Sequence, residues 1–392
     1  MTQTDLIEII RTAYETGTPL THELVRNHHT EPSQMLIDAM RDLPGAIAFL
    51  GVGGKMGGEL VELAHRASPD RRLIAVSRFK GESAPVAEYL EEMDNVNVYR
   101  GDLNDSDFRG SLPQVENLVP LFGHKFGLAT PDAQAQAIAT NVFLPYIVAQ
   151  SFPDAIISTF CSGAVYPQIS AWTEGLSEGQ PNPPSFYGRM IEGREWAYQT
   201  AAAQNGNPLT LYEFYYAQHT SYGILIDIAK KVFNEEEINL AVAPYVNIVS
   251  QRDANEAALI GLLFASNLKH DKRPIKDIEL DTTTDYIGTR MIVAGQKTSV
   301  RYIADKLGEI MEKTPKYRGK ESATAQLGDD TRYKTAAGIT QFRDGVDDLI
   351  GMAALSVMCG MEDWNKPTHF DDPRYVKKNL ARYVRQPAGH TS

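Results

Sequence analysis

Short apolar runs alternate with longer amphipathic segments from residue 46 onward. Six of these runs have the length and the β-branched or aromatic content of buried strands: 46–51, 72–78, 96–102, 117–123, 155–162 and 209–215. Between them lie stretches such as GGELVELAHRAS and AIATNVFLPYIVAQSF, in which apolar residues recur at helical spacing. Strands that alternate with helices in this way indicate βαβ units and a parallel sheet. We therefore predict an α/β fold of the Rossmann type, a doubly wound parallel sheet with a smaller C-terminal α/β substrate portion.

The same pattern divides the chain into three parts. Residues 1–44 predict two or three short helices that form an N-terminal extension, and residues 45–220 hold the six strands of the expected dinucleotide-binding domain. Residues 221–392 are expected to form mainly the substrate-binding portion. We expect the last two parts to be interleaved, with a strand near 244–250 returning to the sheet.

A glycine-rich loop connects the first predicted strand to the first helix. FLGVGGKMGGELVELA places Gly51, Gly54 and Gly57 at i, i+3 and i+6. Such glycines allow a tight turn, close approach of a pyrophosphate, and close packing of helix on sheet. The helix N-terminus offers free N–H groups and a partial positive charge to the phosphates. We predict that these glycines, with Lys55 and Met56, bind a dinucleotide; the alternative is a glycine-rich turn that binds no nucleotide.

The end of the second strand indicates which dinucleotide is bound. Loops that bind NAD usually place an acid there to accept from the ribose hydroxyls, whereas this chain has Ser77 and Arg78. The guanidinium of Arg78 can pair with a 2′-phosphate, and Lys55 could add a second positive group. We therefore predict NADP as the cofactor, with NAD as the second choice; in the alternative view both cations are solvated. Asp102, after the third strand, either accepts from the adenine amino group or caps a helix.

Charge and composition narrow the possible partners. The formal net charge is −12, from 38 basic and 50 acidic residues, which argues against a nucleic-acid partner. No run of about 18 apolar residues could span a bilayer, and the N-terminus does not read as a secretory signal. The two cysteines, Cys161 and Cys359, argue against a disulfide framework and for a reducing compartment. We expect a cytoplasmic protein with a small-molecule substrate and no membrane partner.

Five stretches together resemble one known group of enzymes. LGVGGKMG, YRGDLND, TNVFLPYIVAQSF, FCSGAVYP and SFYGRMIEGRE occur in the order and approximate spacing of the extended short-chain dehydrogenase/reductases. That group includes the NAD(P)-dependent sugar epimerases and dehydratases. The resemblance covers roughly residues 46 to 315, and it implies an oxidoreductase or epimerase/dehydratase that forms a homodimer through two long helices.

The resemblance also implies roles for individual residues. Tyr187 matches the tyrosine that gives or takes a proton while hydride moves to or from nicotinamide, and Ser162 matches the serine that hydrogen-bonds the substrate oxygen. Asn141 falls at a helix position where the group tends to carry an asparagine. Further cofactor contacts are expected from Leu103, Phe122, Gly123 and Asn141.

The lysine that the group carries four residues after the tyrosine is missing. Position 191 holds isoleucine. A lysine there would share a helix face with Tyr187 and lower the pKa of the phenol from roughly 10 towards neutrality. A tyrosine without that help is a poor base at pH 7, yet it remains a usable proton donor. Arg194 and Lys125 are candidates for compensation, and His124 could shuttle protons; we include Lys125 as a third catalytic candidate.

Two other reactive residue types carry no predicted chemistry. Cys161 lacks a recognisable base, so we expect a buried thiol rather than a nucleophile. His28 and His29 have no carboxylate or cysteine at ligand spacing, so we expect no metal site.

Three functions remain open from the sequence. The first is an NADP-dependent oxidoreductase of the epimerase/dehydratase type, acting on a small carbonyl or hydroxyl compound such as a sugar derivative. The second is a nucleotide-binding sensor or scaffold without turnover, which Ile191 favours. The third is a lyase or isomerase that uses a bound cofactor transiently.

Overall fold

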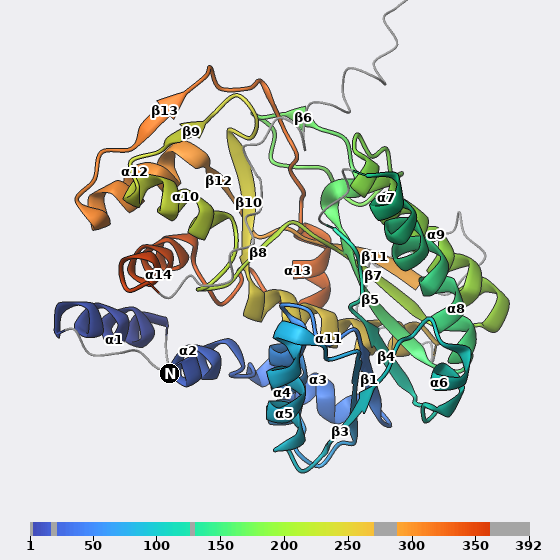
Figure 1. Ribbon diagram of the computed structural model, residues 1–392. Helices are drawn as coiled ribbons and strands as arrows, with labels where there is room; N and C mark the ends of the chain where they lie inside the picture. Colours follow the sequence, from blue (N-terminus) through green and yellow to red (C-terminus); the bar gives the residue numbers. More distant parts are fainter. Residues whose placement is uncertain (1–2, 17–21, 126–129, 270–287, 361–392) are drawn as a thin grey trace, which may run out of the picture.

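A seven-stranded parallel sheet forms the centre of the molecule (Figure 1). The computed structural model describes residues 3–16, 22–125, 130–269 and 288–360. The strand order is β3-β2-β1-β4-β5-β7-β11, and all neighbouring pairs run parallel. The strands are β1 (Ile47–Leu50), β2 (Leu73–Ser77), β3 (Val96–Arg100), β4 (Asn117–Pro120), β5 (Ile156–Ser162), β7 (Leu209–Phe214) and β11 (Gly288–Val293). The predicted Rossmann-type sheet is confirmed, and each of the six predicted runs forms one of its strands.

Helices cover both faces of this sheet. On one face, Ile47 and Phe49 of β1 belong to a buried cluster shared with helices α3, α4, α5 and α11. On the other face, Ala48 and Leu50 belong to a cluster shared with α8 and α9. Because successive side chains of a strand point to opposite faces, burial of both faces requires the continuous apolar runs seen in the sequence. The helices of this domain are α3 (Gln34–Asp42), α4 (Gly57–Ala67), α5 (Ala84–Glu91), α6 (Ser106–Ser111), α7 (Pro131–Ile138), α8 (Leu144–Ser151), α9 (Phe186–Asn205) and α11 (Gln251–Lys269), with a π-helical turn, η2 (Ala139–Phe143), between α7 and α8.

A smaller α/β portion lies beyond one edge of the sheet, at the top in Figure 1. Its three-stranded sheet has the order β12-β10-β8 and packs with three helices around a second core. The elements are β8 (Tyr216–Gln218), β10 (Tyr245–Ser250), β12 (Gln296–Ser299), α10 (Ile224–Phe233), α12 (Val300–Met311) and α14 (Val346–Met358). The turn η1 (Gly81–Ser83) lies in the main domain, between β2 and α5. The remaining short elements are η3 (Gly163–Val165), β6 (Ile169–Ser170), β9 (Glu237–Asn239), β13 (Lys316–Arg318), β14 (Thr324–Ala325) and α13 (Thr331–Ala337).

One strand expectation is corrected by this topology. Residues 244–250 do form a strand, but β10 pairs with β8 and β12 and does not return to the seven-stranded sheet. The strand that extends the main sheet is β11, which pairs with β7. The chain leaves β7 directly into β8, so a partner for β8 is needed outside the main sheet, and β10 supplies it. The two portions are therefore interleaved through β11.

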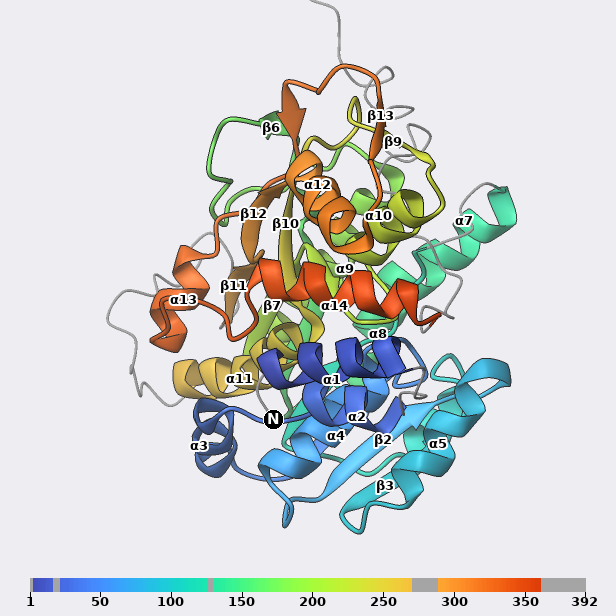
Figure 2. The same cartoon turned by 90° about the vertical axis from the view of Figure 1, so that its left-hand side faces the viewer.

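The N-terminal extension consists of three helices, as predicted. They are α1 (Gln3–Thr16), α2 (His22–His29) and α3, and α1 lies alongside α14 (Figure 2). Ser33 caps α3 by accepting from the Leu36 amide, and its hydroxyl donates to Glu256 of α11 at 2.6 Å. The extension thus joins the main domain to the smaller portion. Among the described helices, none is long and apolar enough to cross a bilayer.

Candidate functional site

The glycine loop has the geometry of an anion-binding turn. Gly51 follows β1 with a positive φ of 94°, and a Cβ atom there would lie 2.7 Å from the Phe122 amide nitrogen. A Cβ atom on Gly57 would lie 2.2 Å from the Val52 carbonyl oxygen. Helix α4 starts at Gly57, and its N-cap residue, Met56, makes no capping hydrogen bond through its side chain. The Gly57 N–H donates to the Gly54 carbonyl at 3.3 Å, and the N-cap side chain does not bond the N–H groups that follow, which can therefore receive a phosphate.

Residues expected to select the dinucleotide gather at the carboxyl ends of β2 and β3. Ser77 ends β2, and a Cβ atom on Gly53 would lie 2.9 Å from its hydroxyl oxygen. Arg78 is exposed and close enough to Asp102 for its charge to lower the pKa of that carboxyl, although hydrogen bonds from Asn104 act more strongly. Asp102 accepts from the Asn104 amide at 2.9 Å. It is not the cap of the next helix, because Asp105 caps α6.

Ser162 and Tyr187 meet at the carboxyl end of β5. Ser162 is the last residue of β5, and Tyr187 lies in the first turn of α9. Ser162 is close enough to Tyr187 for its side chain to help stabilise the ionised phenol. Ser185 caps α9, and a Cβ atom on Gly188 would lie 2.2 Å from the Ala164 carbonyl oxygen. The close approach that Gly188 permits sets Tyr187 beside Ser162.

The lysine position next to this pair is filled by packing. Ile191 is fully buried and belongs to the same apolar cluster that Tyr187 contacts. Burial raises the pKa of Tyr187, while the charge of Arg194 and the Ser162 hydrogen bond act in the opposite direction. The tyrosine is therefore protonated at neutral pH and suited to donate a proton.

Lys125 lies near the tyrosine, at the end of the described segment that precedes residues 126–129. Its ammonium nitrogen is 5.6 Å from the centroid of the Tyr187 ring. The residue is exposed over its surface as a whole, yet protein atoms around the ammonium group remove water and lower its pKa. His124 contributes through its backbone, whose N–H and C=O both bond to the Asn141 side chain, at 3.1 and 2.8 Å.

Lys55 points towards the smaller portion of the molecule. Its ammonium group lies over the ring of Tyr222, in the segment between β8 and α10. Burial and the charge of Asp227 raise the pKa of Tyr222, and Tyr187 is close enough to add to this effect. Sequence reasoning missed Tyr222, because a single tyrosine ahead of an amphipathic helix carries no signal of its own. The Lys55 ammonium group therefore lies on the side of the glycine loop that faces Tyr222.

A second group that the sequence did not reveal is a buried ion cluster behind Ser162. Arg290 of β11 donates to Glu195 at 2.6 Å and to Glu213 at 2.8 Å, and Tyr166 donates to Glu213 at 2.6 Å. Burial raises the pKa of both carboxyls, which favours one shared proton in the cluster. Burial also raises the pKa of the neighbouring Cys161 thiol, so it is protonated at neutral pH and a poor nucleophile.

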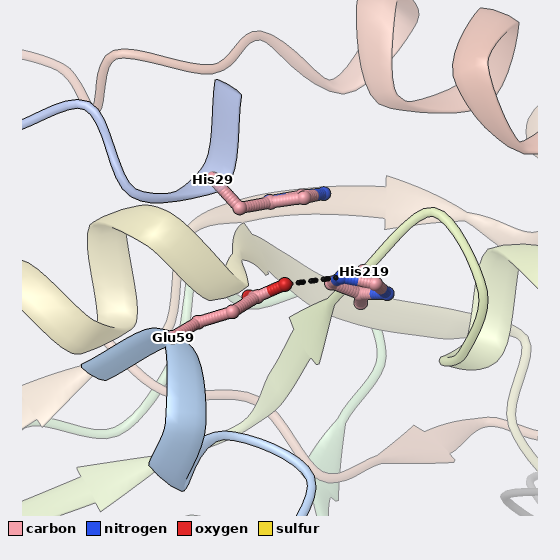
Figure 3. A group of neighbouring side chains, drawn as sticks. All are labelled: His29, Glu59 and His219. Carbon is pink, nitrogen blue, oxygen red and sulfur yellow. Dashed lines mark hydrogen bonds and ion pairs between the residues drawn. The ribbon is translucent and has the colours of Figure 1, made fainter. Parts of the chain in front are cut away.

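His29, Glu59 and His219 lie together although they are far apart in the sequence (Figure 3). They come from α2, α4 and the segment after β8, with their possible ligand atoms within 4.8 Å of one another. His219 Nδ1 accepts from the Ser221 amide at 3.0 Å, so its proton is on Nε2, which faces Glu59 Oε1 at 2.9 Å. The rings of His29 and His219 are stacked, with centroids 4.3 Å apart and planes 26° apart.

This geometry is that of a hydrogen-bonded group. A metal ion needs a free lone pair on each nitrogen, directed at one point, whereas His219 Nε2 carries a proton and the two rings lie in nearly parallel planes. The group instead ties the N-terminal extension to the helix that follows the glycine loop. The absence of a metal site stays a prediction.

The fold was compared with known proteins. No protein-family model and no curated protein matches the sequence. Solved structures do match. A UDP-glucuronic acid 4-epimerase from Bacillus cereus, in complex with a UDP-sugar and NAD, has a TM-score of 0.63 at 13% identity, covering 81% of this chain and 99% of that one. The fold is shared with UDP-sugar 4-epimerases.

Two further structures agree. The UDP-glucose 4-epimerase of Thermotoga maritima gives a TM-score of 0.62 at 16% identity, over 81% of this chain and 100% of that one. The Bordetella bronchiseptica enzyme WbmH, in complex with NAD⁺, gives 0.59 at 15% identity, over 79% and 96%. At identities this low, the structural matches establish the fold alone. That fold agrees with the resemblance drawn from the motifs.

Proposed function

We propose that the protein is an NAD(P)-dependent enzyme of the epimerase/dehydratase type that acts on a sugar nucleotide or a related sugar derivative. The observation that carries this proposal is the placement of Ser162 and Tyr187 together at the carboxyl end of β5, on the same side of the sheet as the glycine loop. Ligands of doubly wound sheets bind at that edge. The neighbours that share the fold, an epimerase bound to UDP-glucuronic acid and NAD among them, support the substrate class.

The residues around the glycine loop fit a dinucleotide. Gly51 and Gly57 stand where any Cβ atom would collide, and the N-terminus of α4 is free to bind a pyrophosphate. Bound there, a nicotinamide cofactor would supply the site for hydride transfer. The adenosine end would be held by Ser77, Arg78, Asp102 and Leu103, and the nicotinamide end would lie near Phe122, Gly123 and Asn141.

The protein side of the reaction is proton transfer at the Tyr187 hydroxyl. Ser162 would orient the substrate oxygen, and Tyr187 would donate its proton to that oxygen or remove one from it. Because burial raises the pKa of Tyr187, the donor role is favoured at neutral pH. The acceptor role requires the phenolate, so oxidation of the substrate is expected to accelerate as the pH rises.

We propose NADP as the preferred cofactor, with NAD second. The end of β2 carries Arg78 and no carboxylate, which suits a 2′-phosphate. The similar structures from Bacillus cereus and Bordetella bronchiseptica contain NAD, and NAD therefore remains the competitor in the test.

Two copies of the chain are proposed to pair through α8 and α9. Large apolar side chains are exposed on these helices and on η2: Phe143 at 62%, Tyr146 at 37%, Ile147 at 38% and Trp196 at 64%. Gathered on helices that lie side by side, such side chains are typical of a protein interface. A helical dimer of this kind would bury them.

A nucleotide sensor without turnover is the second candidate function, and buried Ile191 favours it. One experiment separates the two. Purified protein is titrated with NADP, NADPH, NAD and NADH by calorimetry and is then supplied with UDP-glucose or UDP-glucuronic acid. Interconversion of sugars is followed by chromatography and cofactor reduction by absorbance.

An enzyme would convert at least one sugar nucleotide, and Tyr187→Phe would reduce that rate by about 10²–10⁴-fold. Binding of cofactor without any conversion would favour the sensor. Failure to bind any of the four dinucleotides would overturn both candidates.

A further inference from the structure

Arg194 is a buried cation with neutral hydrogen-bond partners. It lies on α9, seven residues after Tyr187, and only 6% of its surface is exposed. One guanidinium nitrogen donates to the Phe160 carbonyl of β5 at 2.8 Å, and the other donates to the Asn141 amide oxygen. Burying a charge costs free energy unless the charge is paired with an opposite charge and hydrogen-bonded, so the placement of Arg194 needs an explanation.

The charge of Arg194 acts on the hydroxyl groups around the site. It is the largest influence that lowers the pKa of Tyr187, and it also lowers the pKa of the buried Tyr198 and Cys161. In each case it opposes the effect of burial. At Tyr187 this is the effect that a lysine at position 191 would have produced.

The guanidinium also supports the loop that follows β4. A Cβ atom on Gly123 would lie 2.5 Å from one of its terminal nitrogens, so a larger residue there would require the guanidinium to shift. Asn141, which accepts from Arg194, bonds to both backbone groups of His124 as well. Asn141 sits in the π-helical turn η2, a local widening of the helix that often marks functional sites.

We propose that Arg194, held by Asn141 and the Phe160 carbonyl, takes the electrostatic role of the missing lysine by stabilising the Tyr187 phenolate during proton transfer. The proposal rests on the proposed function. When Tyr187 donates, its O–H bond breaks, the proton goes to the substrate oxygen, and the electron pair stays on the phenolate. A bound reduced nicotinamide would supply the hydride for the carbon attached to that oxygen. Arg194 touches neither substrate nor proton and is therefore a positioning residue.

The role of the lysine is thus divided. Arg194, seven residues after Tyr187 on α9, supplies a permanent positive charge, and the buried aliphatic Ile191 occupies the position of the missing lysine. A guanidinium stays charged at every accessible pH, whereas an ammonium buried in the same place could lose its proton.

A substrate-free titration tests this proposal. Tyr187 is replaced by 3,5-difluorotyrosine, whose more acidic phenol ionises at a pH where the protein stays folded, and fluorine NMR follows the ionisation. The same label is placed in Arg194→Met, Arg194→Lys and Arg189→Met, with and without NAD⁺. Arg189 is an exposed arginine on the same helix and serves as the control for loss of one charge.

Arg194→Met is expected to raise the pKa of the labelled phenol by about one unit or more, because an adjacent charge shifts a pKa by that amount. Arg194→Lys should retain most of the wild-type value, and Arg189→Met should leave it unchanged. An unchanged pKa in folded Arg194→Met would overturn the proposal. So would equal upward shifts in the lysine and methionine variants, which would indicate a packing role.

Turnover gives a second measurement. With any sugar nucleotide that the wild type converts, the rising limb of the pH profile should move to higher pH in Arg194→Met and return towards the wild-type position in Arg194→Lys. If no sugar nucleotide is converted, the proposed function fails, while the titration still decides the electrostatic role of Arg194.

Discussion

At the scale of single residues, the central feature is Tyr187 together with the side chains around it. The tyrosine is held by Ser162 and influenced by Arg194, and the position that would carry the lysine is closed by Ile191. Under the proposed function, the proton carrier keeps its position while the charge that assists it comes from a different turn of the same helix. The end of β2 also departs from the usual pattern, since Arg78 occupies the position where an acid would favour NAD.

Replacing Arg78 tests the choice of cofactor. Arg78→Ala is expected to weaken NADP binding by about tenfold or more, because a charged hydrogen bond contributes about 1.5–3 kcal/mol, and to leave NAD binding unchanged. Calorimetry with both cofactors measures the two affinities. Arg72→Ala is the matched control, since Arg72 is an exposed arginine at the opposite end of β2. Equal loss of both cofactors, or no loss of either, would refute the 2′-phosphate contact.

At the scale of elements, the turn from β1 into α4 carries the cofactor proposal. The turn depends on close backbone contacts more than on side-chain chemistry. Gly51 needs a positive φ, and Gly57 lets α4 pack against Val52. We therefore expect substitutions that disturb the backbone of this turn to abolish dinucleotide binding, whereas many changes of side chain would leave binding intact.

Gly57→Ala tests this close packing. The added Cβ atom would meet the Val52 carbonyl oxygen, so we expect the free energy of unfolding to fall by about 1–3 kcal/mol and dinucleotide binding to be lost. Urea unfolding and calorimetry measure the two effects. Gly110→Ala, in α6, is the control, because its Cβ atom would have no neighbour within 4 Å. A stable Gly57→Ala protein that binds NADP normally would contradict the assigned geometry.

The whole molecule is organised around contacts that join distant segments. The N-terminal extension reaches both α14 and the helix that follows the glycine loop, through α1 and through His29. Next to His29, the His28 ring lies 3.9 Å from Asp344, which Arg252 also contacts. On the other side of the molecule, α8 and α9 present the exposed apolar residues assigned to the dimer.

The buried His28 predicts a dependence of stability on pH. Burial, together with the charge of Arg252, lowers its pKa to about 4. The unfolded chain takes up a proton on this histidine near pH 6.5, whereas the folded protein does so only near pH 4, so stability falls as the pH drops through this window. His28→Gln is expected to flatten that decline by about 1–3 kcal/mol.

Urea unfolding at several pH values between 7.5 and 4.5 measures the slope for each protein. Carboxyls whose pKa is raised by burial, such as Asp253 at about 7, act in the opposite direction, so the comparison is made between the two proteins at each pH. Parallel curves for the wild type and His28→Gln would disprove the assignment.

The dimer proposal is tested with two tryptophans. Trp196→Glu places a charge in the proposed interface and is expected to convert the dimer to a monomer, as measured by light scattering after size-exclusion chromatography. Trp172→Glu is the control, because Trp172 is equally exposed, at 67%, but lies outside α8 and α9. A monomeric wild type, or a dimer that survives Trp196→Glu, would reject the interface.

The sequence alone predicted the parallel sheet and the glycine loop, and the resemblance drawn from its motifs implied the pair Ser162 and Tyr187. The sheet and the loop depend on local patterns: apolar runs of strand length, and glycines at i, i+3 and i+6 between a strand and a helix. The sequence also indicated two or three N-terminal helices. Such features can be read because neighbours in the chain create them.

Only the tertiary structure decided which distant groups meet. It assigned the seventh strand to β11 instead of residues 244–250, it placed the Lys55 ammonium on Tyr222, and it buried Arg194 against Asn141. It also brought His29 to Glu59 and His219. Strand partners and buried charges are selected by packing and by the loss of water, which act between segments far apart in the chain and leave no local pattern in it.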